Sequence, residues 1–157
     1  MREITCIFIH CVDSPNGKPV TAREVDRWHA ERINKRELSG RDEEHVKVFN
    51  SQYPYAAYHE LILLSGEAVS LRGEDEPGSH ASGHNQYSVA VCLVGTDKFT
   101  IAQWESLKWI VEDYMKRYGP LRVRGHYEVN NVKSCPGFNI SDWLAGGMEP
   151  LKGHIYE

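Results

Sequence analysis

The chain has 157 residues, of which 41% are hydrophobic and 25% charged, and its formal net charge at pH 7 is −4. This length and composition predict one globular domain over residues 1–157 with a sizeable core. The mixed charges give no basic footprint for nucleic acid, and no apolar run approaches the ~18 residues of a membrane span. We therefore expect neither a nucleic-acid partner nor membrane insertion.

The first predicted elements are a strand and a helix. Residues 4–10 form an apolar, β-branched run that predicts a central strand. A helix is predicted to begin at Thr21, because Glu24 three residues later completes a capping box. The polar and charged segment at 34–52 predicts an exposed excursion.

The middle of the chain predicts a hairpin, a loop and a further strand. Runs at 58–64 and 68–72 flank a Ser-Gly-Glu turn, as expected for two strands of a hairpin. The segment 73–86 is rich in Gly, Ser and His, a composition typical of a binding loop. The strongly apolar run at 87–94 predicts another strand.

The last third predicts a long helix, a short strand and a final helix. Thr-x-x-Gln at its start and apolar residues at helical spacing predict a helix over 100–118. A strand follows at 121–124, and either Asn139 or Ser141 is expected to cap a helix that ends near Leu144. Together the elements predict a mixed α/β fold, with a central, mostly β-sheet flanked by helices.

The N-terminus and the four cysteines indicate the cellular compartment in which the protein is made. The first residues enter a strand-like run directly, without the leader and cleavage site of a signal peptide. We therefore expect synthesis in the cytoplasm with no signal peptide. Two disulfides are arithmetically possible, but free thiols are favoured without secretion. Cys6 and Cys92 lie in apolar runs and are expected to be buried.

The segment 125–137 carries the most specific chemistry. It places His126, Lys133 and Cys135 close together among turn-forming residues. Catalytic zinc usually takes three protein ligands and leaves the fourth position for water. His10, at the end of the first predicted strand, is the best candidate for the third ligand. The sequence thus predicts one zinc ion at one edge of the sheet, with Lys133 placing a positive charge beside it.

Two alternatives compete with this metal site. His80 and His84 have the spacing of a metal pair on a helix, but the glycines around them argue against a helix, so substrate contact is favoured. Cys135 could instead act as a nucleophile with His126 or His10 as its base. It is followed by Pro-Gly, so no helix clearly starts there to lower the pKa of the thiol.

Motifs spread in order along most of the chain resemble the type 2 N-acetylmuramoyl-L-alanine amidases. This family includes the peptidoglycan recognition proteins, and the closest pattern is similar to the small phage lysozymes of the amidase kind. The motifs that carry the resemblance lie at 7–11, 20–25, 58–59, 78–83, 88–95, 124–126 and 133–138.

The resemblance implies a zinc amidase domain that hydrolyses the bond between the lactyl group of N-acetylmuramic acid and L-alanine. It assigns the zinc ligands to His10, His126 and Cys135, catalysis to Tyr58 and Lys133, and substrate contact to His80 and Asn85. Zinc-activated water would attack the carbonyl, the Lys133 ammonium would stabilise the oxyanion, and Tyr58 would orient the water or shuttle a proton. Since neighbours in a strand point to opposite faces, only one of Tyr58 and His59 can face the site.

The implied partner is peptidoglycan or a muropeptide, and we expect a monomer. The favoured role is a phage or prophage endolysin that acts on the cell wall after release. A cytoplasmic muropeptide-recycling amidase and a non-catalytic recognition module are the alternatives. Two departures from the phage pattern stand out: an insertion at 34–53, and one extra residue between His126 and Cys135.

Overall fold

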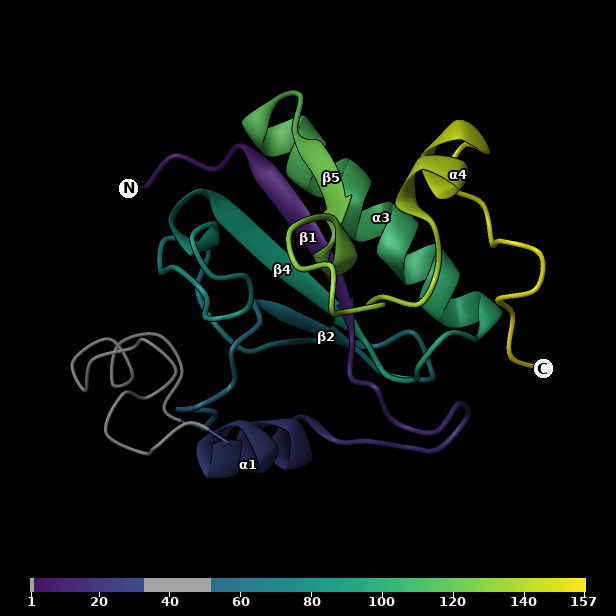
Figure 1. Ribbon diagram of the computed structural model, residues 1–157, viewed down its shortest axis with the longest axis horizontal. Helices are drawn as coiled ribbons and strands as arrows, with labels where there is room; N and C mark the ends of the chain where they lie inside the picture. The colour runs from purple at the N-terminus through teal and green to yellow at the C-terminus, as the bar shows by residue number, and fades with distance from the viewer. Residues whose placement is uncertain (1, 33–51) are drawn as a thin grey trace.

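Figure 1 shows a computed structural model of the chain, which describes residues 2–32 and 52–157. A five-stranded sheet with the order β3-β2-β4-β1-β5 forms its centre. The strands are β1 Cys6–Cys11, β2 Glu60–Ile62, β3 Ala68–Ser70, β4 Ser88–Leu93 and β5 Arg122–Gly125. Strands β2 and β3 pair antiparallel, whereas the pairs β2–β4, β4–β1 and β1–β5 are parallel.

Helices cover both faces of this sheet (Figure 1). Within the described residues, the helices are α1 Ala22–Arg32, α3 Ile101–Tyr118 and α4 Ile140–Ala145, with short 3-10 helices η2 Asn85–Tyr87 and η3 His126–Glu128. No helix within 2–32 or 52–157 is long and apolar enough to cross a membrane. The predicted mixed α/β architecture is confirmed.

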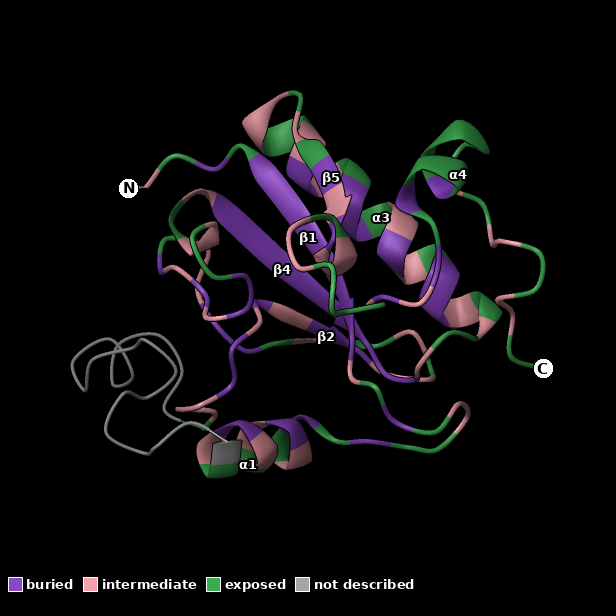
Figure 2. Ribbon diagram, in the orientation of Figure 1, coloured by how far each residue is buried: buried purple, intermediate pink, exposed green. Residues whose placement is uncertain are grey.

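The central strand β1 is buried along its whole length (Figure 2), and its side chains pack on both faces of the sheet. Its side chains alternate between the faces, as in any strand. Ile7 and Ile9 pack in the same core as Trp104 of α3 and Trp143 of α4. Phe8 points the other way, toward the loop that follows β3. A separate core on that second face contains residues of α1, β2 and β4: Val25, Leu61 and Cys92.

Both predicted capping boxes are present. Thr100 Oγ1 accepts the Gln103 N–H at 3.1 Å, and Gln103 Oε1 accepts the Thr100 N–H at 2.9 Å. Thr21 and Glu24 make the same reciprocal pair at 3.1 and 3.2 Å. Asn139, rather than Ser141, caps α4. Each cap satisfies main-chain N–H groups that the first helical turn leaves unpaired, which stabilises a helix by about 1 kcal/mol.

The hairpin strands are shorter than their apolar runs predict. The His59 carbonyl accepts hydrogen bonds from both Leu71 N–H and Arg72 N–H, at 2.8 and 3.5 Å. Two donors on one acceptor break the regular ladder, so β2 begins only at Glu60 and Tyr58 lies before it. All four cysteines are free, and Cys6 and Cys92 are buried, as expected. Most of the predicted insertion at 34–53 lies outside the described residues.

Candidate active site

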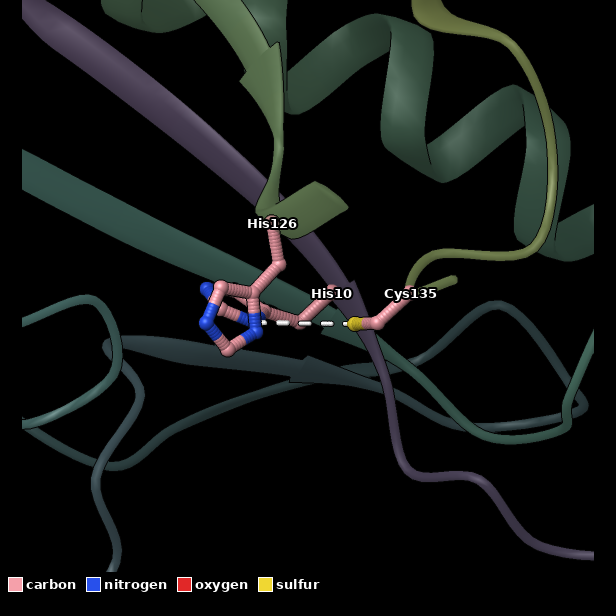
Figure 3. Close-up of side chains that lie close together, drawn as sticks. All are labelled: His10, His126 and Cys135. Carbon is pink, nitrogen blue, oxygen red and sulfur yellow. Dashed lines mark hydrogen bonds between the residues drawn. The ribbon is translucent and has the colours of Figure 1, made fainter. Parts of the chain in front are cut away.

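Three predicted metal ligands converge where strands β1 and β5 end. His10 is the penultimate residue of β1, His126 directly follows β5, and Cys135 lies in the loop after η3. Because β1 and β5 are parallel neighbours, their carboxyl ends lie at the same edge of the sheet. The ligand atoms of the three residues lie within 4.8 Å of one another (Figure 3). Across the described parts of the chain, this is the one group of three or more such residues close enough to hold a metal.

The donor set suits zinc. Two imidazoles and one thiolate leave a fourth tetrahedral position open for water or substrate, as in catalytic zinc sites. Burial, with the nearby His126 and His29, holds the pKa of His10 well below its ordinary value. Burial and the positive charge of Lys133 also lower the pKa of His126. Both rings are therefore neutral at neutral pH, which is the form that a metal binds.

Cys135 is held against β1. Its Sγ lies 3.6 Å from His10 Nδ1, and it accepts a 3.1 Å hydrogen bond from the Cys11 main-chain N–H. A hydrogen bond from Tyr127 N–H to the Cys135 carbonyl, 3.1 Å long, closes the loop between His126 and Cys135. The extra residue of this interval is thus accommodated without separating the two ligands.

The turn after Cys135 requires glycine at position 137. Gly137 has a φ of +89°, and a Cβ at this position would lie 2.2 Å from the Thr96 carbonyl oxygen. The loop that carries Cys135 therefore packs directly against the segment that follows β4. A side chain at position 137 would push Cys135, the candidate ligand, away from the sheet.

Tyr58 faces the His-His-Cys cluster because α1 fixes the chain just before it. Asp26 Oδ1 accepts hydrogen bonds from Tyr55 N–H at 2.7 Å and Ala56 N–H at 2.9 Å. His29 Nδ1 accepts the Ala57 N–H at 2.9 Å. These supports were not predicted from the sequence, although Asp26 and His29 stand three residues apart on one helix face, where side chains act together.

The rings of Tyr58 and His10 lie 5.0 Å apart between centroids. His59 turns away into the protein, where its Nδ1 accepts the Ala90 N–H at 3.0 Å and its Nε2 lies 2.8 Å from the Glu76 carbonyl oxygen. The prediction that only one member of the Tyr58–His59 pair can face the site agrees with this geometry.

A cavity of about 420 Å³ opens beside the cluster. Its lining combines the three ligands with the two predicted catalytic residues and their neighbours: His10, Cys11, Val12, Asp13, Tyr58, His126, Val132, Lys133, Ser134 and Cys135. Lys133 is exposed, so its ammonium can reach a substrate in the cavity. A hydroxyl and an ammonium thus share one cavity with the candidate metal ligands.

His80 and Asn85 occupy positions inside the 73–86 loop. His80 is buried and lies 3.0 Å from His10, measured from Nδ1 to Nε2. Asn85 Oδ1 accepts the main-chain N–H groups of His80 and Ala81 at 2.9 and 3.0 Å. Neither residue is among those that line the cavity. Their substrate contact stays a prediction.

The fold and the site define a mixed α/β protein with a His-His-Cys cluster that could hold a metal ion, at the carboxyl edge of its parallel strands. The model of the N-acetylmuramoyl-L-alanine amidase family matches residues 1–138, and the chain belongs to this family. It is 32% identical over 151 residues to the endolysin of Escherichia phage T7, an alignment that covers 90% of this chain and 87% of the phage protein.

Solved structures share the fold. The N-acetylmuramoyl-L-alanine amidase LysC from Clostridium intestinale superposes with a TM-score of 0.72 at 21% identity, over 96% of this chain and 88% of LysC. Drosophila PGRP-LB superposes with a TM-score of 0.69 at 16% identity, over 100% of this chain and 87% of PGRP-LB. The amidase-like and recognition-protein-like architecture expected from the sequence is confirmed.

Proposed function

We propose that the protein is a zinc-dependent amidase that hydrolyses the bond between N-acetylmuramic acid and L-alanine in peptidoglycan. The observation that carries the proposal is the convergence of His10, His126 and Cys135, with ligand atoms within 4.8 Å of one another. Membership of the amidase family supports the same reaction. These three residues would hold one zinc ion.

Bound zinc would polarise the amide carbonyl and activate water at neutral pH. Cys135 contributes a negative charge, so the site is less positive than one built from three histidines. The Lys133 ammonium lines the same cavity and would stabilise negative charge on the carbonyl oxygen. This second positive charge would offset the effect of the thiolate.

Tyr58 would assist the proton movements of the reaction. Its ring stands 5.0 Å from that of His10, and the residue lines the cavity. From there its hydroxyl would orient the attacking water or carry a proton toward the leaving amine. The main-chain hydrogen bonds from 55–57 to Asp26 and His29 would keep the ring in place.

The proposed substrate is polymeric peptidoglycan, reached after release from the cytoplasm, as expected of an endolysin. The phage T7 relative is an endolysin, and a point mutant of Drosophila PGRP-LB has been solved in complex with tracheal cytotoxin. Asn85 and His80 remain predicted substrate contacts, and the active form is proposed to be a monomer.

Product analysis tests the proposal. The purified protein would be incubated with sacculi and with defined soluble muropeptides, and the products identified by mass spectrometry. We expect a stem peptide with a free L-alanine amino group and a glycan that keeps its lactyl carboxyl group. Cleavage inside the glycan or the stem would contradict the assigned bond, and binding without products would indicate a recognition module. Preference for small muropeptides over sacculi would favour recycling.

A further inference from the structure

His80 lies behind the metal cluster. Only 8% of its surface is exposed, yet both of its ring nitrogens have polar neighbours. Nδ1 is 3.0 Å from His10 Nε2, and Nε2 is 3.2 Å from Ser88 Oγ. Ser88 in turn donates its hydroxyl proton to the His84 carbonyl oxygen over 2.8 Å. A continuous chain of hydrogen bonds therefore leads from His10 to a main-chain carbonyl.

The carbonyl at the end of this chain fixes the direction of every bond in it. A carbonyl oxygen only accepts, so the single Ser88 hydroxyl proton points at His84. Ser88 Oγ is then left to accept, which places a proton on His80 Nε2. In the neutral ring of His80, Nδ1 carries a lone pair and accepts from His10 Nε2–H. His10 is thereby held in the tautomer whose Nδ1 is free to bind a metal.

That free nitrogen is the one that faces the other ligands. His10 Nδ1, not Nε2, lies 3.6 Å from Cys135 Sγ. The opposite tautomer would carry a proton on Nδ1, pointing into the cluster, and would leave two lone pairs facing each other between His10 and His80. Only the tautomer with its proton on His10 Nε2 therefore satisfies the hydrogen bond to His80 and leaves Nδ1 free for a metal.

The His80 ring is also fixed by packing. Its centroid lies 5.7 Å from that of Phe8, which is fully buried. A Cβ at Gly78 would lie 2.6 Å from His80 Cδ2 and 2.8 Å from the Ala57 carbonyl oxygen, so only glycine fits there. Asn85 Oδ1 holds the His80 main-chain N–H at 2.9 Å. The ring has little room to rotate away from His10.

We propose that His80 is a positioning residue for the metal: it accepts a hydrogen bond from His10 Nε2 and orients His10 Nδ1 as a ligand. Partners of this kind orient ligating histidines and raise their basicity, and their loss typically weakens metal affinity about 10–100-fold. The inference rests on the proposed zinc chemistry and gives His80 a function that requires no contact with substrate.

Zinc affinity, measured by competition with a chromophoric chelator, tests this role without any assay of hydrolysis. His80→Phe keeps a ring of similar size but removes the acceptor, and it is expected to weaken zinc binding about 10–100-fold. His80→Asn places an amide oxygen near the position of Nδ1 and is expected to restore most of the affinity. His154→Gln is the control, because the His154 side chain lies against the Asp97 carbonyl oxygen and outside this chain of hydrogen bonds, and it should bind zinc like the unmodified protein.

Two outcomes separate the possible failures. If the unmodified protein binds zinc and a folded His80→Phe variant binds it equally well, the positioning role is overturned and the proposed function stands. If the unmodified protein binds no zinc, both are overturned. Should His80→Phe fail to fold, long-range ¹H–¹⁵N spectra of the unmodified protein decide: a proton on His10 Nε2 supports the role, and a proton on Nδ1 overturns it.

Discussion

The main-chain N–H of Cys11 donates a 3.1 Å hydrogen bond to the Sγ of Cys135, a residue 124 positions later in the chain. Cys11 directly follows His10, so this bond ties the loop ligand to the strand that carries the first ligand. The donor also fixes the position of the sulfur beside the imidazole of His10, whose Nδ1 lies 3.6 Å away. One candidate ligand, His10, is thus part of β1, and a second, Cys135, is bonded to the next residue of the same strand.

Substitution of the thiolate should remove the metal. Cys135→Ser is expected to lose nearly all zinc and all lysis of sacculi, because a serine hydroxyl is a far weaker zinc ligand than a thiolate. Zinc content by mass spectrometry and turbidity of a sacculus suspension measure the two effects. Cys6→Ala, which changes a buried cysteine away from the cavity, is the control and should keep both. A metal-free Cys135→Ser variant with full activity would rule out zinc catalysis.

Loss of the Lys133 ammonium should separate chemistry from metal binding. Lys133→Ala is expected to keep its zinc and to lose about 100–1000-fold in kcat, the range seen when one oxyanion-stabilising donor is removed. Steady-state kinetics on a defined muropeptide, together with zinc analysis, provide the test. Lys152→Ala removes an exposed lysine elsewhere and serves as the comparison. Unchanged kcat in Lys133→Ala would exclude Lys133 from the mechanism.

Asp26 should influence activity without touching substrate. Asp26→Ala removes the acceptor for Tyr55 N–H and Ala56 N–H, which precede Tyr58. We expect a loss of about 1–3 kcal/mol in the free energy of unfolding, together with a lower kcat and normal zinc content. Asp26→Asn keeps an amide oxygen at the same place and should retain most of both. Urea denaturation and kinetics measure the two effects, and normal kcat in the alanine variant would show that Tyr58 needs no such support.

Glu60 should make stability depend on pH. Burial raises its pKa to about 7; a hydrogen bond from Ser70 opposes the shift, and nearby Glu74 adds to it. The folded state thus holds the proton more tightly than the unfolded state, whose pKa is near 4.5. The stability contribution of Glu60 is therefore complete below pH 4.5 and lost as the pH rises through 7. Glu60→Gln is expected to be more stable than the unmodified protein at pH 8, by on the order of 1–2 kcal/mol.

Urea denaturation of Glu60→Gln and of the unmodified protein at pH 4 and pH 8 measures this difference. A stability gain of the same size at both pH values would show that shape rather than charge at position 60 is responsible. Glu67→Gln, on the turn between β2 and β3, is an exposed control for a change in net charge.

Features that depend on a few neighbouring residues could be predicted from the sequence. The pairs Thr21–Glu24 and Thr100–Gln103 cap their helices as expected, because donors and acceptors lie within one turn. The start of β2 could not be predicted in this way. It depends on how the His59 carbonyl pairs with Leu71 and Arg72, which follow β3, and this pairing exists only in the assembled sheet.

The same distinction holds for the site. The spacing of His126 and Cys135 and the family resemblance indicated the ligands, and the structure brings them together with His10. The support of Tyr58 by Asp26 and the approach of His80 to His10 were not apparent in the sequence. Both arise from the docking of α1 and of the 73–86 loop on the sheet, which no local pattern encodes.

The alternation of side chains along β1 makes the proposed metal site sensitive to changes in chain length. Phe8 and His10 face the cavity side, while Ile7 and Ile9 face α3. An amino acid inserted between Cys6 and His10 would reverse this order for every residue after it, unless the strand bulged. The imidazole would then point into the apolar core beneath α3. Such a mutant gene would still encode all three candidate ligands and the whole family motif, yet its product would lack the proposed zinc site.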